Sequence, residues 1–293
     1  MNTAAKLSAY GVTLALLATG AWAIGTAVGP LTSEAGAPGQ EEHAGGGDEH
    51  SGTVAEAEHV DQPEGLASAR GGYTLTPTRT TLTPGTTESF SFRITGPGGD
   101  PVTRFEVEHE KRMHLIVVRR DTADFQHIHP EMTADGTWSV PLNLPDPGAY
   151  RVFADFAPSG GEAMTLGADL FAPGDFQPVT HEPSRVSRVD GYEVRLDGHL
   201  VAGEASEVRL TVSKDGRPVT NLQPYLGADG HLVALRGGDL AYLHVHPGGE
   251  NSGGPVIPFI AEVPSAGTYR LFLDFQHDGV VRTAEFTVEG ERS

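Results

Sequence analysis

A repeated histidine pattern constrains the fold of this chain more than any other feature of its sequence. In each copy a lone histidine opens an apolar run, and 13 positions later comes the first histidine of a His-x-His-Pro segment. The matched residues are His114, His127 and His129 in the first copy and His231, His244 and His246 in the second. Self-similarity over this length predicts two similar domains rather than a longer repeat array.

Both copies continue into a third related segment, Tyr-Arg-x-Phe-x-Asp-Phe, over residues 150–156 and 269–275. Apolar and polar residues alternate along 89–94 and 207–212, which is typical of half-buried strands. The chain also has 38 Gly and 21 Pro, a composition that suits many short strands joined by turns. The sequence therefore predicts an all-β protein with two tandem immunoglobulin-like β-sandwich domains.

The order of segments follows from charge and composition. Residues 7–33 carry no charge and follow Lys6, so 1–30 is expected to be a transmembrane anchor or a cleaved signal peptide. A retained anchor would hold the domains outside the cytoplasm at the cell membrane, and cleavage would secrete them. The further expected segments are a disordered acidic linker with histidines over 31–71, a β-sandwich over 72–174, a linker over 175–190 and a β-sandwich over 191–290.

Net charge and cysteine content exclude several functions. A net charge of −19 argues against nucleic acid as a partner, because phosphates would be repelled. There is no cysteine, which excludes disulfides and thiolate metal sites. No Gly-x-Ser-x-Gly, phosphate-loop or His-Glu-x-x-His motif occurs, so we do not expect an enzyme.

The histidine hairpin brings three imidazoles to one face of a sheet. His127 and His129 share a face because alternate residues of a strand point the same way. A hairpin that pairs His114 with His129 turns at 121–122, and the same register in the second copy turns at Gly238 and Asp239. Cross-strand and diagonal neighbours at such spacings can reach a common ion, and imidazoles suit Zn(II) or Cu(II).

An aspartate in the third segment of each copy completes the candidate set. It would supply a fourth oxygen ligand, or accept a hydrogen bond that orients a histidine; a hydrogen bond to a turn is the alternative. The candidate metal ligands are His114, His127, His129 and Asp155 in the first copy and His231, His244, His246 and Asp274 in the second. His109 and His277 have no counterpart in the other copy and are expected to be solvated.

A second interpretation remains open. Duplication of a domain also duplicates its packing residues, so the matched histidines can be structural. The chain would then be a membrane-tethered immunoglobulin-like interaction module with a protein partner at the cell envelope. Against this, three histidines on one small face repel each other once protonated near pH 6.5.

Several blocks of the sequence resemble a known group of exported bacterial proteins described as heavy-metal-binding. The blocks are Phe-Gln-His-Ile-His-Pro, Asp-Gly-Thr-Trp-Ser-Val-Pro-Leu and Tyr-Arg-Val-Phe-Ala-Asp-Phe, with Tyr-Leu-His-Val-His-Pro in the second copy. The resemblance covers roughly residues 73–289, and the domains are more loosely similar to copper-resistance β-sandwiches of the CopC or YtkA-like type. It implies metal buffering, delivery or resistance without catalysis. The Met-rich stretch of a Cu(I) carrier is absent, which leaves Cu(II) or Zn(II).

Overall fold

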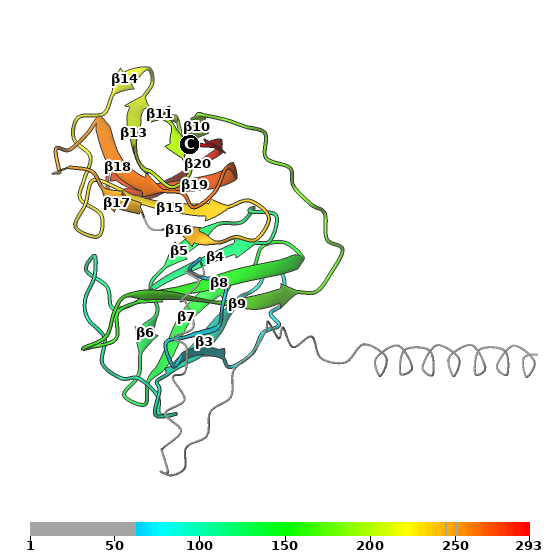
Figure 1. Ribbon diagram of the computed structural model, residues 1–293. Helices are drawn as coiled ribbons and strands as arrows, with labels where there is room; N and C mark the ends of the chain where they lie inside the picture. Colours follow the sequence, from blue (N-terminus) through cyan, green and yellow to red (C-terminus); the bar gives the residue numbers. More distant parts are fainter. Residues whose placement is uncertain (1–62, 244, 250) are drawn as a thin grey trace, which may run out of the picture. The chain divides into compact units, whose positions relative to one another are not determined.

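The computed structural model describes residues 63–243, 245–249 and 251–293, and every regular element among them is a β-strand (Figure 1). The described residues include no helix long and apolar enough to cross a membrane. The expected anchor over 1–30 and most of the expected linker over 31–71 lie outside the described residues. The predicted all-β class and the two repeated sandwich domains are confirmed.

Domain 1 consists of two sheets. The first has the strand order β1 (Ala69–Arg70), β2 (Tyr73–Pro77), β3 (Thr87–Thr95), β7 (Thr137–Asn143) and β6 (Glu131–Met132). The second has the order β5 (Gln126–Ile128), β4 (His114–Arg119), β8 (Gly148–Phe156) and β9 (Met164–Ala172). In β3 the buried side chains of Phe90, Phe92 and Ile94 alternate with outward-facing polar ones, so the apolar face is turned to the second sheet.

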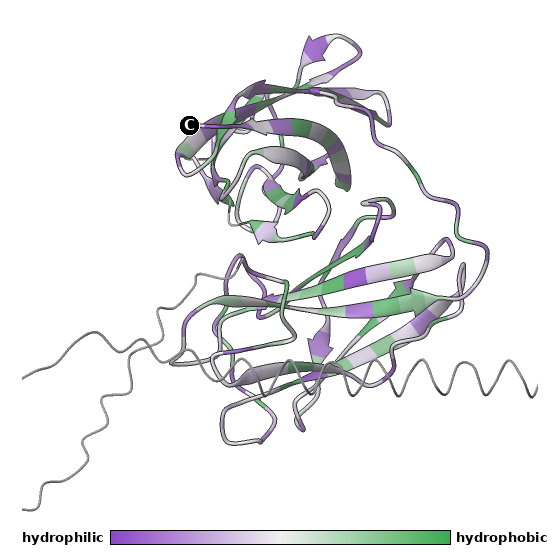
Figure 2. Cartoon of the chain, turned by 45° about the vertical axis from the view of Figure 1, so that its right-hand side comes forward, coloured by the Kyte–Doolittle hydropathy of each residue, from purple (hydrophilic) through white to green (hydrophobic). Residues whose placement is uncertain are grey.

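Domain 2 repeats this plan with additional short strands. One sheet has the order β10 (Val186–Val189), β11 (Tyr192–Gly198), β13 (Ala205–Lys214), β18 (Val256–Glu262) and β17 (Val245–Pro247), and β14 (Arg217–Pro218) pairs with β13. The other has the order β12 (Leu200–Val201), β20 (Val280–Glu291), β19 (Gly267–His277), β15 (His231–Arg236) and β16 (Tyr242–Leu243). Figure 2 shows the hydrophobic and hydrophilic residues that alternate along these strands.

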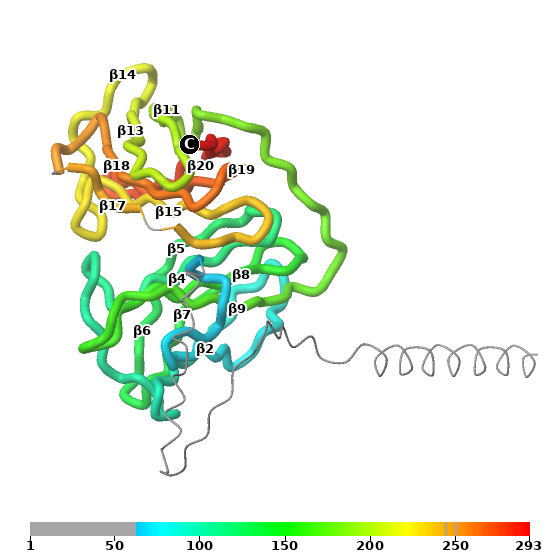
Figure 3. The backbone as a smooth tube through the Cα atoms, in the orientation of Figure 1, coloured from blue at the N-terminus to red at the C-terminus, as the bar shows by residue number. Residues whose placement is uncertain are grey.

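Both domains begin earlier in the chain than the sequence predicted. β1 lies inside the expected linker 31–71. The Leu75 amide donates to the Ser68 carbonyl and the Gly167 amide donates to the Ala67 carbonyl, and these hydrogen bonds attach the segment to domain 1. β10 lies inside the expected linker 175–190, where it pairs with β11. Residues 173–183 contain no strand and form the connection between the domains (Figure 3).

The hairpin register agrees with the sequence in both copies, but the second hairpin is shorter. In domain 1, Leu115 pairs with Ile128, which sets His114 opposite His129. In domain 2, Ala234 pairs with Leu243 in the same register. The chain then crosses to the other sheet, where His246 pairs with Ile260 in the β17–β18 ladder. The expected cross-strand pair of His231 and His246 is therefore wrong.

A third apolar core joins the two domains. Leu115 and Val117 of β4 point into domain 1, so Ile116 and Val118 point to the opposite face of their sheet. There they pack with Phe153 of β8 against domain 2, which contributes Val233, Leu235, Leu240 and Phe272. The rings of Phe125 and Phe272 stack with centroids 4.0 Å apart, and Tyr242 contacts Phe153 with centroids 5.6 Å apart. The joined faces are the faces that carry the lone histidines.

Candidate metal site

Three histidines of domain 1 meet where the two domains join. His114 opens β4 on the same face as Ile116. His127 belongs to β5, the strand beside it, and His129 follows the end of that strand. The Nδ1 atom of His114 lies 3.1 Å from Nε2 of His127 and 3.2 Å from Nε2 of His129. One nitrogen of each ring lies within 4.8 Å of the others, which is the arrangement of three ligands around one ion. The convergence expected from the first hairpin is present.

Hydrogen bonds fix the tautomers of two of these rings. Nε2 of His114 lies 3.1 Å from the backbone oxygen of Glu108, and Nδ1 of His127 lies 2.8 Å from Oδ2 of Asp274. A carbonyl and a carboxylate accept hydrogen bonds, so both ring nitrogens must be donors. When both rings are neutral, the remaining nitrogens, Nδ1 of His114 and Nε2 of His127, carry lone pairs and face each other at 3.1 Å. An Nε2–H group of His129 can donate to only one of them.

Burial keeps the rings of His114 and His129 neutral. Loss of hydration, together with the neighbouring imidazoles, lowers the pKa of both His114 and His129 to about 3. Burial also lowers the pKa of His231 in domain 2 to about 4, with His109 and His127 contributing. Neutral imidazole is the form that binds metals, and His114 and His129 are in this form at physiological pH.

Asp274 reaches the site from the other domain. Its side chain and that of His127 are each only 4 % exposed, so their hydrogen bond is shielded from water. The hydroxyl of Thr283 donates to the second carboxylate oxygen at 2.6 Å and holds the group in place. The sequence assigned Asp274 to a site of domain 2, whereas the structure sets it on a histidine of domain 1.

Asp155, the equivalent residue of domain 1, is not part of the three-histidine group. It pairs with His114 across the β4–β8 ladder, and its carboxylate accepts a 3.3 Å hydrogen bond from Thr165 and another from the hydroxyl of Tyr242. Tyr242 belongs to domain 2, so each aspartate bonds a side chain of the opposite domain. The structure thus sets Asp155 outside the group that the sequence placed it in, and its role as a metal ligand stays a prediction.

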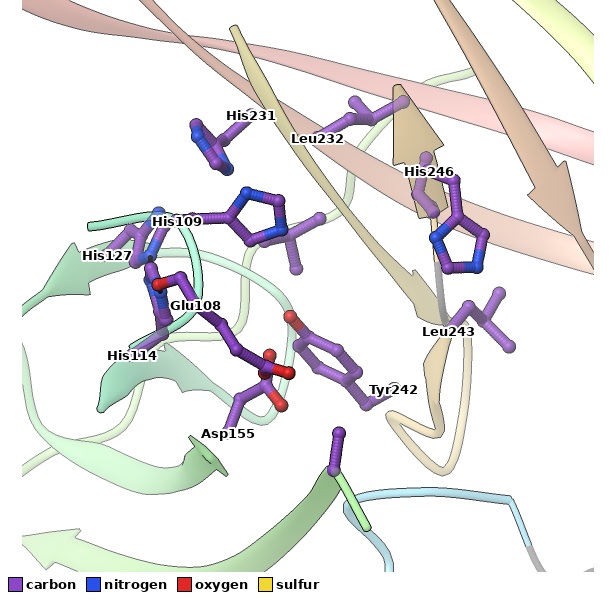
Figure 4. Close-up of a pocket in the computed structure, with 13 residues that line it drawn as sticks. Glu108, His109, His114, His127, Asp155, His231, Leu232, Tyr242, Leu243 and His246 are labelled. Carbon is purple, nitrogen blue, oxygen red and sulfur yellow. Dashed lines mark hydrogen bonds between the residues drawn. The ribbon is translucent and has the colours of Figure 1, made fainter. Parts of the chain in front are cut away.

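The second predicted site is not assembled from the residues that the structure describes. His231 and His246 both line a pocket of about 410 Å³, but Figure 4 shows His231 beside His109, His114 and His127, with His246 at the far end. The β17 strand carries His246 away when it joins the other sheet. His244 lies outside the described residues. The lone histidines of the two copies thus come together, whereas two separate sites were expected.

His109 lies beside the histidines of the site, which the sequence did not indicate, and the prediction that His277 is solvated is wrong. His109 is exposed as expected, but its ring lies 4.9 Å from that of His231 and 6.1 Å from that of His114. His277 is buried, with Nδ1 2.7 Å from the Tyr192 hydroxyl. One signal could have indicated the interface: 115–118 is apolar on both faces, a pattern typical of a strand covered on both sides.

The comparisons with known proteins identify the domain family. Residues 67–170 and 187–292 each match the family described as Domain of unknown function (DUF8832). No curated protein matches the chain. The two matched ranges cover most of the described residues and coincide with the two sandwich domains.

Several solved structures of bacterial proteins are similar in part. The Escherichia coli adhesin FdeC is 13% identical, with 77% of this chain and 65% of that chain covered at a TM-score of 0.25. InvD of Yersinia pseudotuberculosis is also 13% identical, with 77% and 59% covered at 0.26. A membrane-anchored protein of Corynebacterium diphtheriae is 9% identical, with 76% and 59% covered at 0.23. The chain spans less than two thirds of each of these proteins, and such low TM-scores support no argument about function.

None of the proteins named here is described as binding a metal or as related to CopC. The similarity to heavy-metal-binding proteins therefore remains a prediction of the sequence. What the comparisons do show is a duplicated family domain.

Proposed function

The chain belongs to the DUF8832 family, and we propose that it binds one divalent transition-metal ion through His114, His127 and His129. The ion would be Zn(II) or Cu(II), and the protein would buffer or deliver it outside the cytoplasm, without catalysis. Metal resistance is the physiological role that such binding would serve.

The observation that carries this proposal is the pair of facing lone pairs. Nδ1 of His114 and Nε2 of His127 are 3.1 Å apart, and the opposite nitrogen of each ring donates a hydrogen bond elsewhere. Two lone pairs at this distance repel unless a cation lies near both. A proton on His114 is disfavoured at neutral pH because burial lowers its pKa to about 3. A metal ion satisfies both nitrogens.

The distances also suit a tetrahedral ion. Metal–nitrogen bonds of about 2.0–2.1 Å at tetrahedral angles set neighbouring nitrogens about 3.3 Å apart. The two nitrogen pairs that involve His114 are 3.1 and 3.2 Å apart. The Asp274–His127 hydrogen bond is the carboxylate–histidine arrangement that commonly orients metal ligands and raises their basicity.

The donor set narrows the choice of metal. Imidazoles bind Zn(II) and Cu(II) well, whereas Cu(I) prefers sulfur ligands. The chain has no cysteine, and Met113, the residue before His114, is buried in the core of domain 1. Zn(II) and Cu(II) therefore remain the two candidates.

Metal titration of the full-length chain tests the proposal. The wild type should bind one Zn(II) or Cu(II) ion per chain at this site by calorimetry. The double variant His114→Gln/His129→Ala should lose that binding. His199→Ala is the matched control, because His199 is exposed and pairs with Glu291 at 2.8 Å, away from the three-histidine group. Equal binding by the wild type and the double variant would refute the assignment.

A second candidate is the interaction module, in which the histidines are structural. It is favoured by the hydrogen bond between His127 and Asp274, which already links the two domains without an ion. The joined domains would then present their remaining surfaces to a protein or surface partner at the cell envelope. In this case the double variant would lose stability, and neither protein would bind metal more tightly than free histidine does.

A further inference from the structure

The histidine cluster extends from domain 1 into domain 2 through His231. The ring of His231 lies 6.4 Å from that of His114 and 6.3 Å from that of His127. The three ring pairs within domain 1 are separated by 4.9 to 5.3 Å. The ring centroid of His231 is therefore about one ångström farther from the rings of His114 and His127 than the three rings of domain 1 are from one another.

The tautomer of His231 is fixed in the same way as that of His114. Nε2 of His231 lies 3.2 Å from the backbone oxygen of Leu226, just as Nε2 of His114 lies 3.1 Å from that of Glu108. Since the carbonyl accepts, Nε2 carries the hydrogen and Nδ1 of His231 carries a lone pair. This is the atom by which its counterpart His114 enters the three-histidine group.

Contacts on either side of the site hold His231 near it. His231 pairs directly with Asp274 across the β15–β19 ladder, and Asp274 is bonded to His127 of domain 1. Val233, two residues along β15 on the same face, belongs to the apolar core shared by the domains. These contacts keep the ring of His231 beside the rings of His114 and His127.

We propose that His231 is the fourth ligand, so that the bound ion is a closed four-histidine site that links domain 1 to domain 2. This inference rests on the proposed function, because it needs an ion at His114, His127 and His129. Four protein ligands are typical of structural zinc sites, whereas catalytic sites leave one position for water. The ion would thus couple metal loading to the docking of the domains.

His109 is the competing fourth ligand. Its ring lies 6.1 Å from that of His114. However, His109 is an exposed loop residue, whereas the ring of His231 is within contact range of two members of the group. The structure therefore favours His231.

Cobalt substitution with azide as a probe distinguishes a closed site from an open one. The full-length wild type loaded with Co(II) should give a visible spectrum that does not change when azide is added, because no water ligand is available for exchange. His231→Ala and the ring-preserving His231→Phe should both make the spectrum sensitive to azide and should weaken Co(II) binding by about tenfold or more. His109→Ala should leave the spectrum insensitive.

The outcomes separate this inference from the proposed function. Failure of the wild type to bind Co(II) would refute the proposed function and this inference with it. Binding by a wild type whose spectrum already responds to azide would keep the three-histidine site and refute the fourth ligand. A response that arises in His109→Ala and not in either His231 variant would overturn the assignment in favour of His109.

Discussion

Nδ1 of His127 lies 2.8 Å from Oδ2 of Asp274, although the two residues are 147 positions apart in the sequence and belong to different domains. Both side chains are almost completely buried, and the Thr283 hydroxyl donates to the other carboxylate oxygen of Asp274. A carboxylate in this position orients the ring and leaves Nε2 free to bind a metal. The second domain thus determines the orientation of a residue in the first.

Asp274→Asn should therefore weaken metal binding without removing a ligand. An amide can present its NH₂ group to His127 and favour the wrong tautomer, and loss of such a partner typically costs about 10- to 100-fold in affinity. The measurement is Zn(II) affinity by competition with a chelating dye. Asp155→Asn is the matched control, because Asp155 occupies the equivalent position but bonds Thr165 and Tyr242. Equal losses in both variants would contradict the assigned role of Asp274.

The metal-free protein should lose stability in mild acid. The folded pKa values of His114 and His129 are about 3 and that of His231 is about 4, all below the ordinary value of 6.5. Between the folded and the unfolded pKa values, the unfolded chain binds protons that the folded chain does not. The free energy of unfolding therefore has its full value above pH 6.5 and falls as the pH decreases below 6.5. The limiting slope is about 1.4 kcal/mol per pH unit for each fully shifted group.

Urea unfolding of the metal-free chain from pH 7.5 to pH 4.5 measures this dependence. His129→Gln removes one of the three groups and should give a shallower decline than the wild type, while His199→Ala should follow the wild type. A decline of the same slope in His129→Gln would show that other groups cause the acid sensitivity.

The sequence predicted the local geometry well because that geometry depends on period and spacing. Alternation defined the strands, and equal spacing in the two copies gave the hairpin register that pairs Leu115 with Ile128 and Ala234 with Leu243. It could not predict what covers the outer face of each hairpin. The alternation of apolar and polar residues distinguishes the two faces of a strand, but it does not indicate which segment packs on either face.

The same limit explains the misplaced site residues. The position of Asp274 beside His127 depends on the docking of Phe125 against Phe272, a contact between distant parts of the chain. The crossing of β17 to the opposite sheet depends on pairing with β18, which no spacing near His246 indicates. Sequence spacing thus predicted two similar hairpins, whereas tertiary packing brings their lone histidines together at one site.

Phe272→Ala should weaken both folding and metal binding. The Phe272 ring is completely buried and stacks on Phe125 with an interplanar angle of 5°. Truncation of a buried phenylalanine typically costs about 3–5 kcal/mol, and here the cavity opens in the contact between domains, two residues from Asp274. We expect lower stability in urea and lower Zn(II) affinity at concentrations where the protein remains folded.

Phe286→Ala provides the matched control for that variant. Phe286 is 1% exposed but lies within the core of domain 2 alone. Its truncation should destabilise the protein by a similar amount and leave the Zn(II) affinity of the folded protein close to that of the wild type. If both variants lose affinity equally, docking of the domains does not determine metal binding.

Gly167→Ala should detach the segment that precedes domain 1 from both domains. A Cβ atom at Gly167 would lie 2.0 Å from the carbonyl oxygen of Gly65 and 2.5 Å from a guanidinium nitrogen of Arg151. The Gly65 oxygen accepts two hydrogen bonds from Arg151, and the neighbouring Glu64 oxygen accepts one from the amide of Tyr242 in domain 2. Relief of the clash must break these bonds, at a cost of about 1–3 kcal/mol.

Limited proteolysis with urea unfolding tests that variant. Gly167→Ala should be cleaved near Arg70 faster than the wild type and should unfold at lower urea. Gly98→Ala is the control, because the nearest atom to its Cβ would be 4.0 Å away. If Gly167→Ala is cleaved and unfolds like Gly98→Ala, then residues 64–67 do not stabilise the contact between domain 1 and domain 2.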